Sequence, residues 1–178
     1  MSSQPKKYSV HKIFGPTIQG EGGMSGVVSH FIRLSGCNMW DGRPETREAS
    51  QCPFCDTDFL SHTMMTADEI LQALLLQTMD NRAAHGLARP KSLEDWRELS
   101  SEWVTISGGE PLLQIDWDLC ETLSTGYKIA VETNGTVEMN PRLLRWVDYI
   151  TMSPKVPRDE IRLSSADCLK VLHPHPNP

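Results

Sequence analysis

The sequence predicts an α/β fold, a partial (β/α) barrel of about six mainly parallel strands, in a single domain over residues 1–178. Short apolar, β-prone runs recur along the chain, and most of them lead directly into a polar or glycine-rich motif. Helical patterns fall between these runs, and strands that alternate with helices are typical of βα units with a parallel sheet. Because about six strands are too few for a full eight-stranded barrel, an open, partial barrel fits the length better.

The expected strands are YSVHKIF (8–14), VVSHFIRL (27–34), EWVTI (102–106), YKIAV (127–131), DYITM (148–152) and DCLKVL (167–172). Helices are expected between them. Thr66 and Glu69 form a capping-box pattern ahead of an apolar helix face. A shorter helix is expected around 119–123, and Asn140-Pro141 matches the start of another that would contain Val147.

Residues 80–102 are polar and weakly patterned, so we expect an insertion there with one short helix around 93–99. The motifs that follow the strands should gather at one rim of the sheet. That rim, at the carboxyl ends of parallel strands, is where barrels and open α/β sheets place their active sites.

Composition excludes several classes of protein. The formal net charge of −6 gives no basic face for a nucleic acid, and no apolar run approaches the roughly 18 residues of a membrane span. Residues 1–8 are polar with no apolar signal region after them, so we expect a cytoplasmic protein. Five cysteines, an odd number, then indicate metal binding or catalysis rather than disulfides.

Cys37, Cys52 and Cys55 have the spacing C-x14-C-x2-C and suggest a metal centre. A structural zinc prefers four protein ligands, and His62 is the candidate for the fourth. The alternative is a four-iron cluster, which usually has four cysteines, so three would leave one iron open to a substrate or cofactor. Cys120 and Cys168 lie among apolar neighbours and are expected to fill the core.

Two motifs follow later strands. In ISGGEP (106–111), the two glycines permit close backbone approach, free N–H groups could bind a carboxylate, and Glu110 could accept from an ammonium group. An ordinary strand-to-helix turn explains the same residues. ETNG (132–135) is equally ambiguous, because Asn134-Gly135 is a common turn dipeptide, although Glu132 could accept from ribose hydroxyls or a guanine-like edge.

Polar groups that suit a ring-shaped substrate occur near the first strands. TIQGEG (17–22) offers the Gln19 amide and the Glu21 carboxylate, or it is simply a glycine-rich turn. Arg33 lies in a strand and could clamp a carboxylate through two hydrogen bonds. Residues 56–58, Asp-Thr-Asp, offer hard oxygens that suit Mg²⁺.

In this order, the three-cysteine loop, GGEP, ETNG and SPK (153–155) resemble the radical S-adenosylmethionine enzymes. IFGPTIQGEG (13–22), FIRLSGCN (31–38) and CDTDF (55–59) narrow the resemblance to the 7-carboxy-7-deazaguanine synthase family, and the likeness runs from Val10 to Leu172. Most radical S-adenosylmethionine enzymes space their cysteines C-x3-C-x2-C, but a subset of this family has such an expanded loop. The family usually continues beyond CLKVL, so we expect a fragment, a natural minimal form, or a form completed by a partner.

The resemblance implies a chemistry. The three cysteines would hold a [4Fe–4S] cluster whose open iron binds S-adenosylmethionine, and reductive cleavage of that cofactor would give a 5′-deoxyadenosyl radical. The radical would remove hydrogen from C6 of 6-carboxy-5,6,7,8-tetrahydropterin, and ring contraction with loss of ammonia would give 7-carboxy-7-deazaguanine, a queuosine precursor. The family also implies Mg²⁺, a flavodoxin or ferredoxin as reductant, and a homodimer.

The resemblance also implies roles for single residues, and no protein side chain is expected to be catalytic. The expected metal ligands are Cys37, Cys52, Cys55 and, for Mg²⁺, Thr57. The expected substrate-binding residues are Ile18, Gln19, Gly20, Glu21, Arg33 and Ser107. The expected cofactor-binding residues are Gly109, Glu110, Glu132, Asn134, Ser153, Pro154 and Lys155, with Lys170 as a further candidate. Two alternatives stay open: a radical enzyme with another substrate, such as a glycyl-radical activase, and a non-catalytic zinc-binding module.

Overall fold

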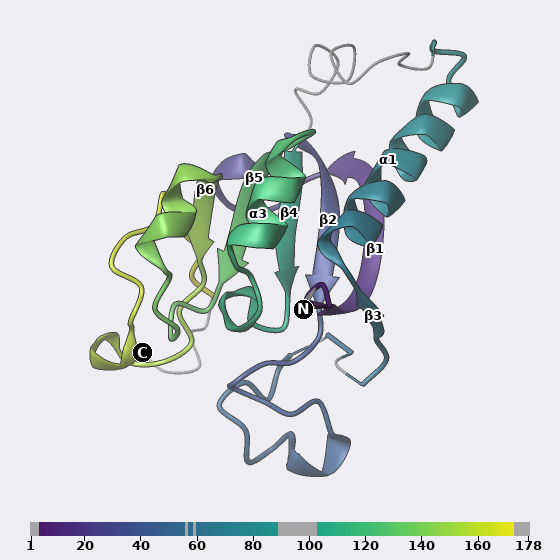
Figure 1. The fold of residues 1–178 in the computed structure, drawn as a ribbon. Coiled ribbons are helices and arrows are strands. Elements are labelled where there is room, and N and C mark those ends of the chain that lie inside the picture. The colour runs from purple at the N-terminus through teal and green to yellow at the C-terminus, as the bar shows by residue number, and fades with distance from the viewer. Residues whose placement is uncertain (1–3, 56, 59, 89–102, 173–178) are drawn as a thin grey trace.

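The computed structural model describes residues 4–55, 57–58, 60–88 and 103–172. Within these residues, seven strands form one sheet in the order β3-β1-β2-β4-β5-β6-β7 (Figure 1). The strands are β1 (Tyr8–Ile18), β2 (Val28–Leu34), β3 (Thr63–Met65), β4 (Trp103–Gly108), β5 (Lys128–Thr133), β6 (Val147–Met152) and β7 (Cys168–Leu169). From β2 to β7 neighbouring strands are parallel, whereas β1 pairs antiparallel with both β2 and β3. This mixed sheet confirms the predicted fold class.

Each of the six predicted strands is present, and β3 is an additional short one that the sequence analysis missed. The capping box is also confirmed. Helix α1 (Ala67–Ala84) begins after Thr66, whose hydroxyl accepts from the Glu69 N–H at 3.2 Å, while the Glu69 carboxylate accepts from the Thr66 N–H at 2.7 Å. Helix α3 (Trp117–Ser124) is the predicted shorter helix.

Two predicted boundaries differ from the structure. Asn140 does cap the Arg142 N–H, but only a 3₁₀ helix (Pro141–Arg145) follows, because Val147 already starts β6. Helix α1 runs to Ala84, so the first residues of the expected insertion are helical. The short helix expected around 93–99 lies outside the described residues.

The alternation of side chains along the central strands gives the sheet two different faces. One face is apolar and packs against α1 and α3, which lie on the same side of the sheet (Figure 1). Its fully buried residues are Ile32, Leu34, Val104, Ile106, Ile129 and Val131, and they meet Ile70, Leu74, Leu119 and Leu123 from the two helices. Burial of this apolar surface is the main source of stability for the sheet.

The opposite face presents the intervening side chains of the same strands. Phe31 and Arg33 of β2, Ser107 of β4 and Glu132 of β5 line a cavity on this side. Arg33 pairs with Ser107 in the parallel β2–β4 register, so both lie near the carboxyl ends of their strands. The loop after β2 extends from this same end of the sheet (Figure 1).

Among the described residues, no helix combines the length and the apolar character that a membrane crossing needs.

Candidate active site

An open cavity of about 940 Å³ lies at the carboxyl ends of the parallel strands. Its volume is in the upper part of the range of small-molecule sites, roughly 300–1,000 Å³. Most of the predicted site residues line it: Ile18, Gln19, Gly20, Glu21, Arg33, Cys37, Cys52, Cys55, Thr57, Ser107, Gly109, Glu132, Asn134, Ser153, Lys155 and Lys170. Glu110 and Pro154 are not among the lining residues. The fold therefore brings together groups that span more than 150 positions of sequence.

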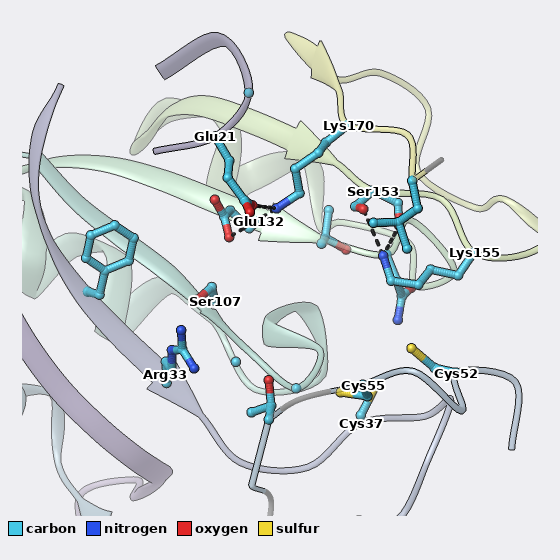
Figure 2. Close-up of a pocket in the computed structure, with 18 of the residues that line it drawn as sticks. Glu21, Arg33, Cys37, Cys52, Cys55, Ser107, Glu132, Ser153, Lys155 and Lys170 are labelled. Carbon is cyan, nitrogen blue, oxygen red and sulfur yellow. Dashed lines mark hydrogen bonds and ion pairs between the residues drawn. The ribbon is translucent and has the colours of Figure 1, made fainter. Parts of the chain in front are cut away.

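The three cysteines of the predicted metal centre occupy one side of this cavity (Figure 2). They pack around Met39 and Val156. The pKa of the Cys52 thiol is raised, first by its hydrogen bond with Cys55 and then by burial, and burial also raises the pKa of Cys37. Burial and the Cys52–Cys55 hydrogen bond thus favour the protonated thiols, and a metal bound here would have to displace their protons.

The zinc alternative finds no support in the placement of His62. This side chain is exposed, its Nδ1 lies 3.2 Å from the Leu60 carbonyl oxygen, and the ring does not line the cavity. Among the residues that the structure describes, no group of three or more His, Cys, Asp or Glu side chains converges on the position of one ion. Three thiols without a fourth protein ligand suit a four-iron cluster with one open iron better than a closed zinc site.

A half-buried lysine, Lys155, lies beside the thiols. Lys155 donates from Nζ to the Ser153 hydroxyl at 2.8 Å and to the Ser153 carbonyl at 3.1 Å (Figure 2). Burial lowers the pKa of Lys155, and the neighbouring cysteines partly offset this shift. The side chains of Ser153 and Lys155 line the cavity, whereas Pro154, which lies between them in the chain, does not.

Away from the cysteines, the cavity carries hydrogen-bonding groups that suit a polar ring. The Gln19 amide donates to Glu132 at 2.9 Å, and Lys170 Nζ lies 2.7 Å from Glu21 and 4.0 Å from Glu132 (Figure 2). The hydrogen bond from Lys170 holds the pKa of Glu21 below its usual value. Three elements, the β1–β2 connection, β5 and the segment at β7, thus meet in one charged network.

Arg33 lies apart from this network, over an aromatic surface. Its guanidinium is 5.5 Å from the centre of the Phe14 ring, and Phe14 stacks on Phe31 with ring centres 5.0 Å apart. Since both rings line the cavity, Arg33 is held by a cation–π contact with its donors available on the cavity side. The sequence analysis missed these two aromatic residues, although Phe31 alternates in phase with Arg33 along β2.

The two glycines of ISGGEP are expected from the sequence to allow a ligand to approach the backbone. In the structure they allow the backbone of Leu34 and Gly36 to approach instead. A Cβ on Gly109 would lie 1.8 Å from the Gly36 carbonyl oxygen, and one on Gly108 would lie 2.3 Å from the Leu34 carbonyl oxygen. The N–H of Gly109 donates to Leu34 at 2.8 Å, and that of Glu110 donates to Gly36 at 2.9 Å. These N–H groups are therefore not free for a carboxylate. The close approach is to the chain itself, just before Cys37.

The sequence analysis expects Glu110 to accept a hydrogen bond from an ammonium group of a ligand. In the structure its side chain is fully buried. Its carboxylate accepts from the Thr133 hydroxyl at 2.7 Å and from the N–H groups of Asn134 and Leu112 at 2.8 and 3.0 Å. Burial raises the pKa of Glu110, and these hydrogen bonds oppose the shift. The carboxylate thus joins the GGEP and ETNG turns.

Asn134 extends this connection to the cysteine loop. Its Nδ2 donates to the Asn38 side chain at 3.1 Å, and Asn38 in turn donates to the Thr136 hydroxyl at 2.7 Å. Asn38 directly follows the first cysteine. Glu110 and Asn134 therefore help to position the loop that carries Cys37. This role could not be predicted from sequence patterns, because the partners are far apart in the chain.

Of the two described residues considered for Mg²⁺, Thr57 lines the cavity and Asp58 does not. Asp58 is exposed and accepts from the backbone N–H groups of Leu60 and Ser61 and from the Ser61 hydroxyl. Asp56 lies outside the described residues. Thr57 therefore supplies a hydroxyl oxygen close to the cysteines, and Asp58 caps its own turn.

Comparison with known proteins shows which family has this arrangement of cysteines and polar groups. The chain is 37% identical over 173 residues to 7-carboxy-7-deazaguanine synthase from Nitratidesulfovibrio vulgaris, and the alignment covers 94% of this chain and 71% of the relative. The enzyme of the same name from Bradyrhizobium diazoefficiens is 38% identical over 168 residues, with 94% and 72% covered. This chain belongs to the 7-carboxy-7-deazaguanine synthase family.

A solved structure supports the same fold for this family member. QueE from Escherichia coli superposes with a TM-score of 0.52 at 23% identity, over 88% of this chain and 64% of that one. No protein-family model matches the chain. The family assignment thus depends on the sequence relatives, and the partial-barrel fold is supported independently by the solved structure.

We predict that Glu110→Gln lowers the free energy of unfolding by about 1–3 kcal/mol, because the new amide NH₂ group would face a donor in a buried site. Urea denaturation measures this change. Glu138→Gln is the matched control, since Glu138 is exposed. Equal stability of the two variants would contradict the role assigned to Glu110.

Proposed function

We propose that this chain is a radical S-adenosylmethionine lyase that converts 6-carboxy-5,6,7,8-tetrahydropterin to 7-carboxy-7-deazaguanine and ammonia, in the biosynthesis of 7-deazaguanines such as the queuosine precursor. One observation carries the proposal. In a member of this family, a single cavity has three thiols on one side and the polar groups of Gln19, Glu21, Arg33 and Glu132 elsewhere on its wall. The net reaction is redox neutral, since product and ammonia together account for every atom of the substrate.

The cysteine side of the cavity fits an iron–sulfur cluster and S-adenosylmethionine, which family membership implies. Cys37, Cys52 and Cys55, which line this side of the cavity, would hold the cluster through soft thiolate ligands. When bound, the cluster and the cofactor would supply the carbon-centred radical that removes hydrogen from the substrate. Lys155 lies near the three cysteines, where its ammonium group would offset the negative charge of a thiolate-bound cluster.

Contacts with the cofactor can be proposed for residues that reach the cavity beside the thiols. Ser153 and Lys155 offer a hydroxyl and an ammonium group, and Gly109 offers backbone atoms that no side chain shields. Asn134 lines the same region. For Glu110 we propose a positioning role instead, because its carboxylate is buried and fully engaged. Pro154 would act only by holding Ser153 and Lys155 in place.

Substrate contacts can be proposed on the remaining wall. The substrate carboxylate would pair with Arg33, whose guanidinium can donate two parallel hydrogen bonds. The aminopyrimidine edge of the pterin carries N–H donors and a carbonyl acceptor, which suit the carboxylates of Glu21 and Glu132 and the Gln19 amide. Ile18, Gly20 and Ser107 would complete the pocket around the ring.

The charged network prepares these groups before substrate binds. Lys170 keeps Glu21 ionised, and Gln19 fixes the direction of the Glu132 carboxylate. The substrate's N–H donors would therefore meet acceptors that are already oriented. Phe14, Phe31, Met39 and Phe54 add apolar wall area that would reduce the access of water to the reacting groups.

Three partners of the proposed reaction stay predictions: Mg²⁺ at Thr57, a flavodoxin or ferredoxin as electron donor, and a second copy of the chain in a homodimer. The cytoplasmic location inferred from the sequence also stays a prediction. The hard hydroxyl oxygen of Thr57 supports the first.

The decisive experiment is an anaerobic reaction that contains reconstituted protein, dithionite, Mg²⁺, S-adenosylmethionine and 6-carboxytetrahydropterin. Mass spectrometry should detect 7-carboxy-7-deazaguanine with wild-type protein and none with Cys52→Ala. Cys120→Ala is the matched control, because Cys120 is buried in the core away from the cavity. Formation of 5′-deoxyadenosine without the deazaguanine would refute the substrate assignment.

Arg33→Ala should weaken binding of 6-carboxytetrahydropterin by about 10- to 100-fold, since hydrogen bonds to a charged group contribute about 1.5–3 kcal/mol. Anaerobic calorimetry measures the Kd, and the iron content should equal that of wild type. Arg142→Ala, a change at an exposed site, should leave the Kd unchanged. An unchanged Kd for Arg33→Ala would exclude the carboxylate contact.

Removal of Mg²⁺ with a chelator, followed by passage into metal-free buffer, should slow product formation, and added Mg²⁺ should restore it. Thr57→Val should remove this response, with a rate about 10- to 100-fold below wild type, whereas Thr57→Ser keeps the hydroxyl ligand and the response. The readout is the initial rate of deazaguanine formation. Equal rates with and without Mg²⁺ would retire Thr57 as a metal ligand.

A further inference from the structure

The fourteen residues between Cys37 and Cys52 form a lobe that is closed at its base. The N–H of Gln51 donates to the carbonyl oxygen of Met39 at 3.2 Å, so the two chain segments meet just inside the cysteines. Residues 40–50 lie beyond this neck. Neither Gln51 nor any residue between 40 and 50 lines the main cavity. Residues 40–50 are therefore not part of the wall of the proposed substrate cavity, and another role must be sought for them.

Trp40 is the buried centre of the lobe, with only 5% of its surface exposed. Its indole Nε1 donates to the Arg43 carbonyl at 3.1 Å and lies 3.2 Å from the Thr46 hydroxyl. The guanidinium of Arg47 lies over the Trp40 ring, 4.1 Å from its centre. This short distance is typical of a cation–π contact, so the indole determines where the guanidinium sits.

Arg47 reaches out of the lobe to the turn that carries the other two cysteines. Its Nη1 donates to the carbonyl oxygens of Pro53 at 3.1 Å and of Cys55 at 2.5 Å. The turn is closed internally by the Cys55 N–H, which donates to the Cys52 carbonyl at 3.2 Å. Two carbonyls of the C-x2-C turn are thus held by one planar cation, and the thiols of Cys52 and Cys55 project into the cavity.

We propose that Arg47 is a positioning residue for the metal-binding cysteines. Held over Trp40, it fixes the backbone of the 52–55 turn so that both thiols already face the cavity when a cluster binds. Groups that orient metal ligands typically alter metal affinity by about 10- to 100-fold when they are removed. The inference rests on the proposed function in one respect, because it takes an iron–sulfur cluster as the ligand of these thiols.

The matched control lies in the same lobe. Arg43 has the same charge, its side chain is largely exposed, and its Nε is 3.9 Å from Asp41. Arg43→Met and Arg47→Met therefore remove the same group from the same segment, and only the second removes the contact with the turn. Arg47→Lys retains a cation and a donor but loses the planar surface that stacks on the indole.

The first test is cluster retention without substrate or S-adenosylmethionine. Full-length proteins are reconstituted anaerobically, iron and sulfide are quantified, and cluster absorbance is followed after addition of an iron chelator. We expect Arg47→Met to lose its cluster at least about 10-fold faster than wild type. Arg43→Met should match wild type, and Arg47→Lys should fall between. Equal rates for Arg47→Met and Arg43→Met would overturn the inference.

The second test uses the metal-free proteins. Iodoacetamide alkylation is mapped by mass spectrometry, with Cys168 as the internal reference because it lies outside the cavity lining. Cys52 and Cys55 should react faster in Arg47→Met than in Arg43→Met, since a loosened turn exposes them. Circular dichroism tests whether both variants fold. If Arg47→Met does not fold, the reaction rates of Cys52 and Cys55 are compared between Arg47→Lys and Arg43→Met instead.

These readouts separate this inference from the proposed function. Wild-type protein that retains its cluster but forms no deazaguanine would overturn the proposed function and leave the role of Arg47 intact. Product formation together with identical cluster loss in both methionine variants would overturn only the role of Arg47.

Discussion

The backbone of Gly109 packs directly on the backbone of Gly36, with no room for a side chain between them, and much of the site depends on this contact. It joins the end of β4 to the segment that leads into Cys37 through two short hydrogen bonds. The Glu110 carboxylate continues the connection to the turn after β5. Because the loop that carries the three cysteines is long and has little regular structure, these buried links determine where Cys37 lies relative to the sheet.

The cavity is chemically divided, and the sheet is the cause. Alternation along β2, β4 and β5 sends aliphatic side chains to the helices and sends Phe31, Arg33, Ser107 and Glu132 to the other face. The thiols come from a loop at the edge of that face, not from the strands themselves. Soft ligands and hard hydrogen-bonding groups are thereby kept on separate walls of one space. Such a separation suits a reaction in which a cofactor at one wall acts on a polar ring at another.

Much of the fold and of the site could be predicted from the sequence, because strand periodicity and short motifs are local properties. The strands from β4 to β6 end in motifs that do line the cavity, as their order along the chain indicated. The predictions that failed concerned contacts between residues far apart in the sequence. The partners of Glu110 lie 23 and 24 positions away, so its burial could not be seen, and the N–H groups after Gly108 are used by residues of β2 and its loop. β3 is three residues long, too short for a periodic pattern.

The closed neck of the cysteine lobe has a consequence for how such loops change length in evolution. The hydrogen bond between Met39 and Gln51 brings together the two ends of segment 40–50. Without that segment, three residues, Asn38, Met39 and Gln51, would remain between Cys37 and Cys52. That remainder is the C-x3-C spacing typical of most radical S-adenosylmethionine enzymes. The expanded motif is then the common motif with a side branch inserted at one point, because a branch closed at its base leaves the path of the main chain unchanged. Insertions of many lengths could arise at this point without disturbing the three thiols.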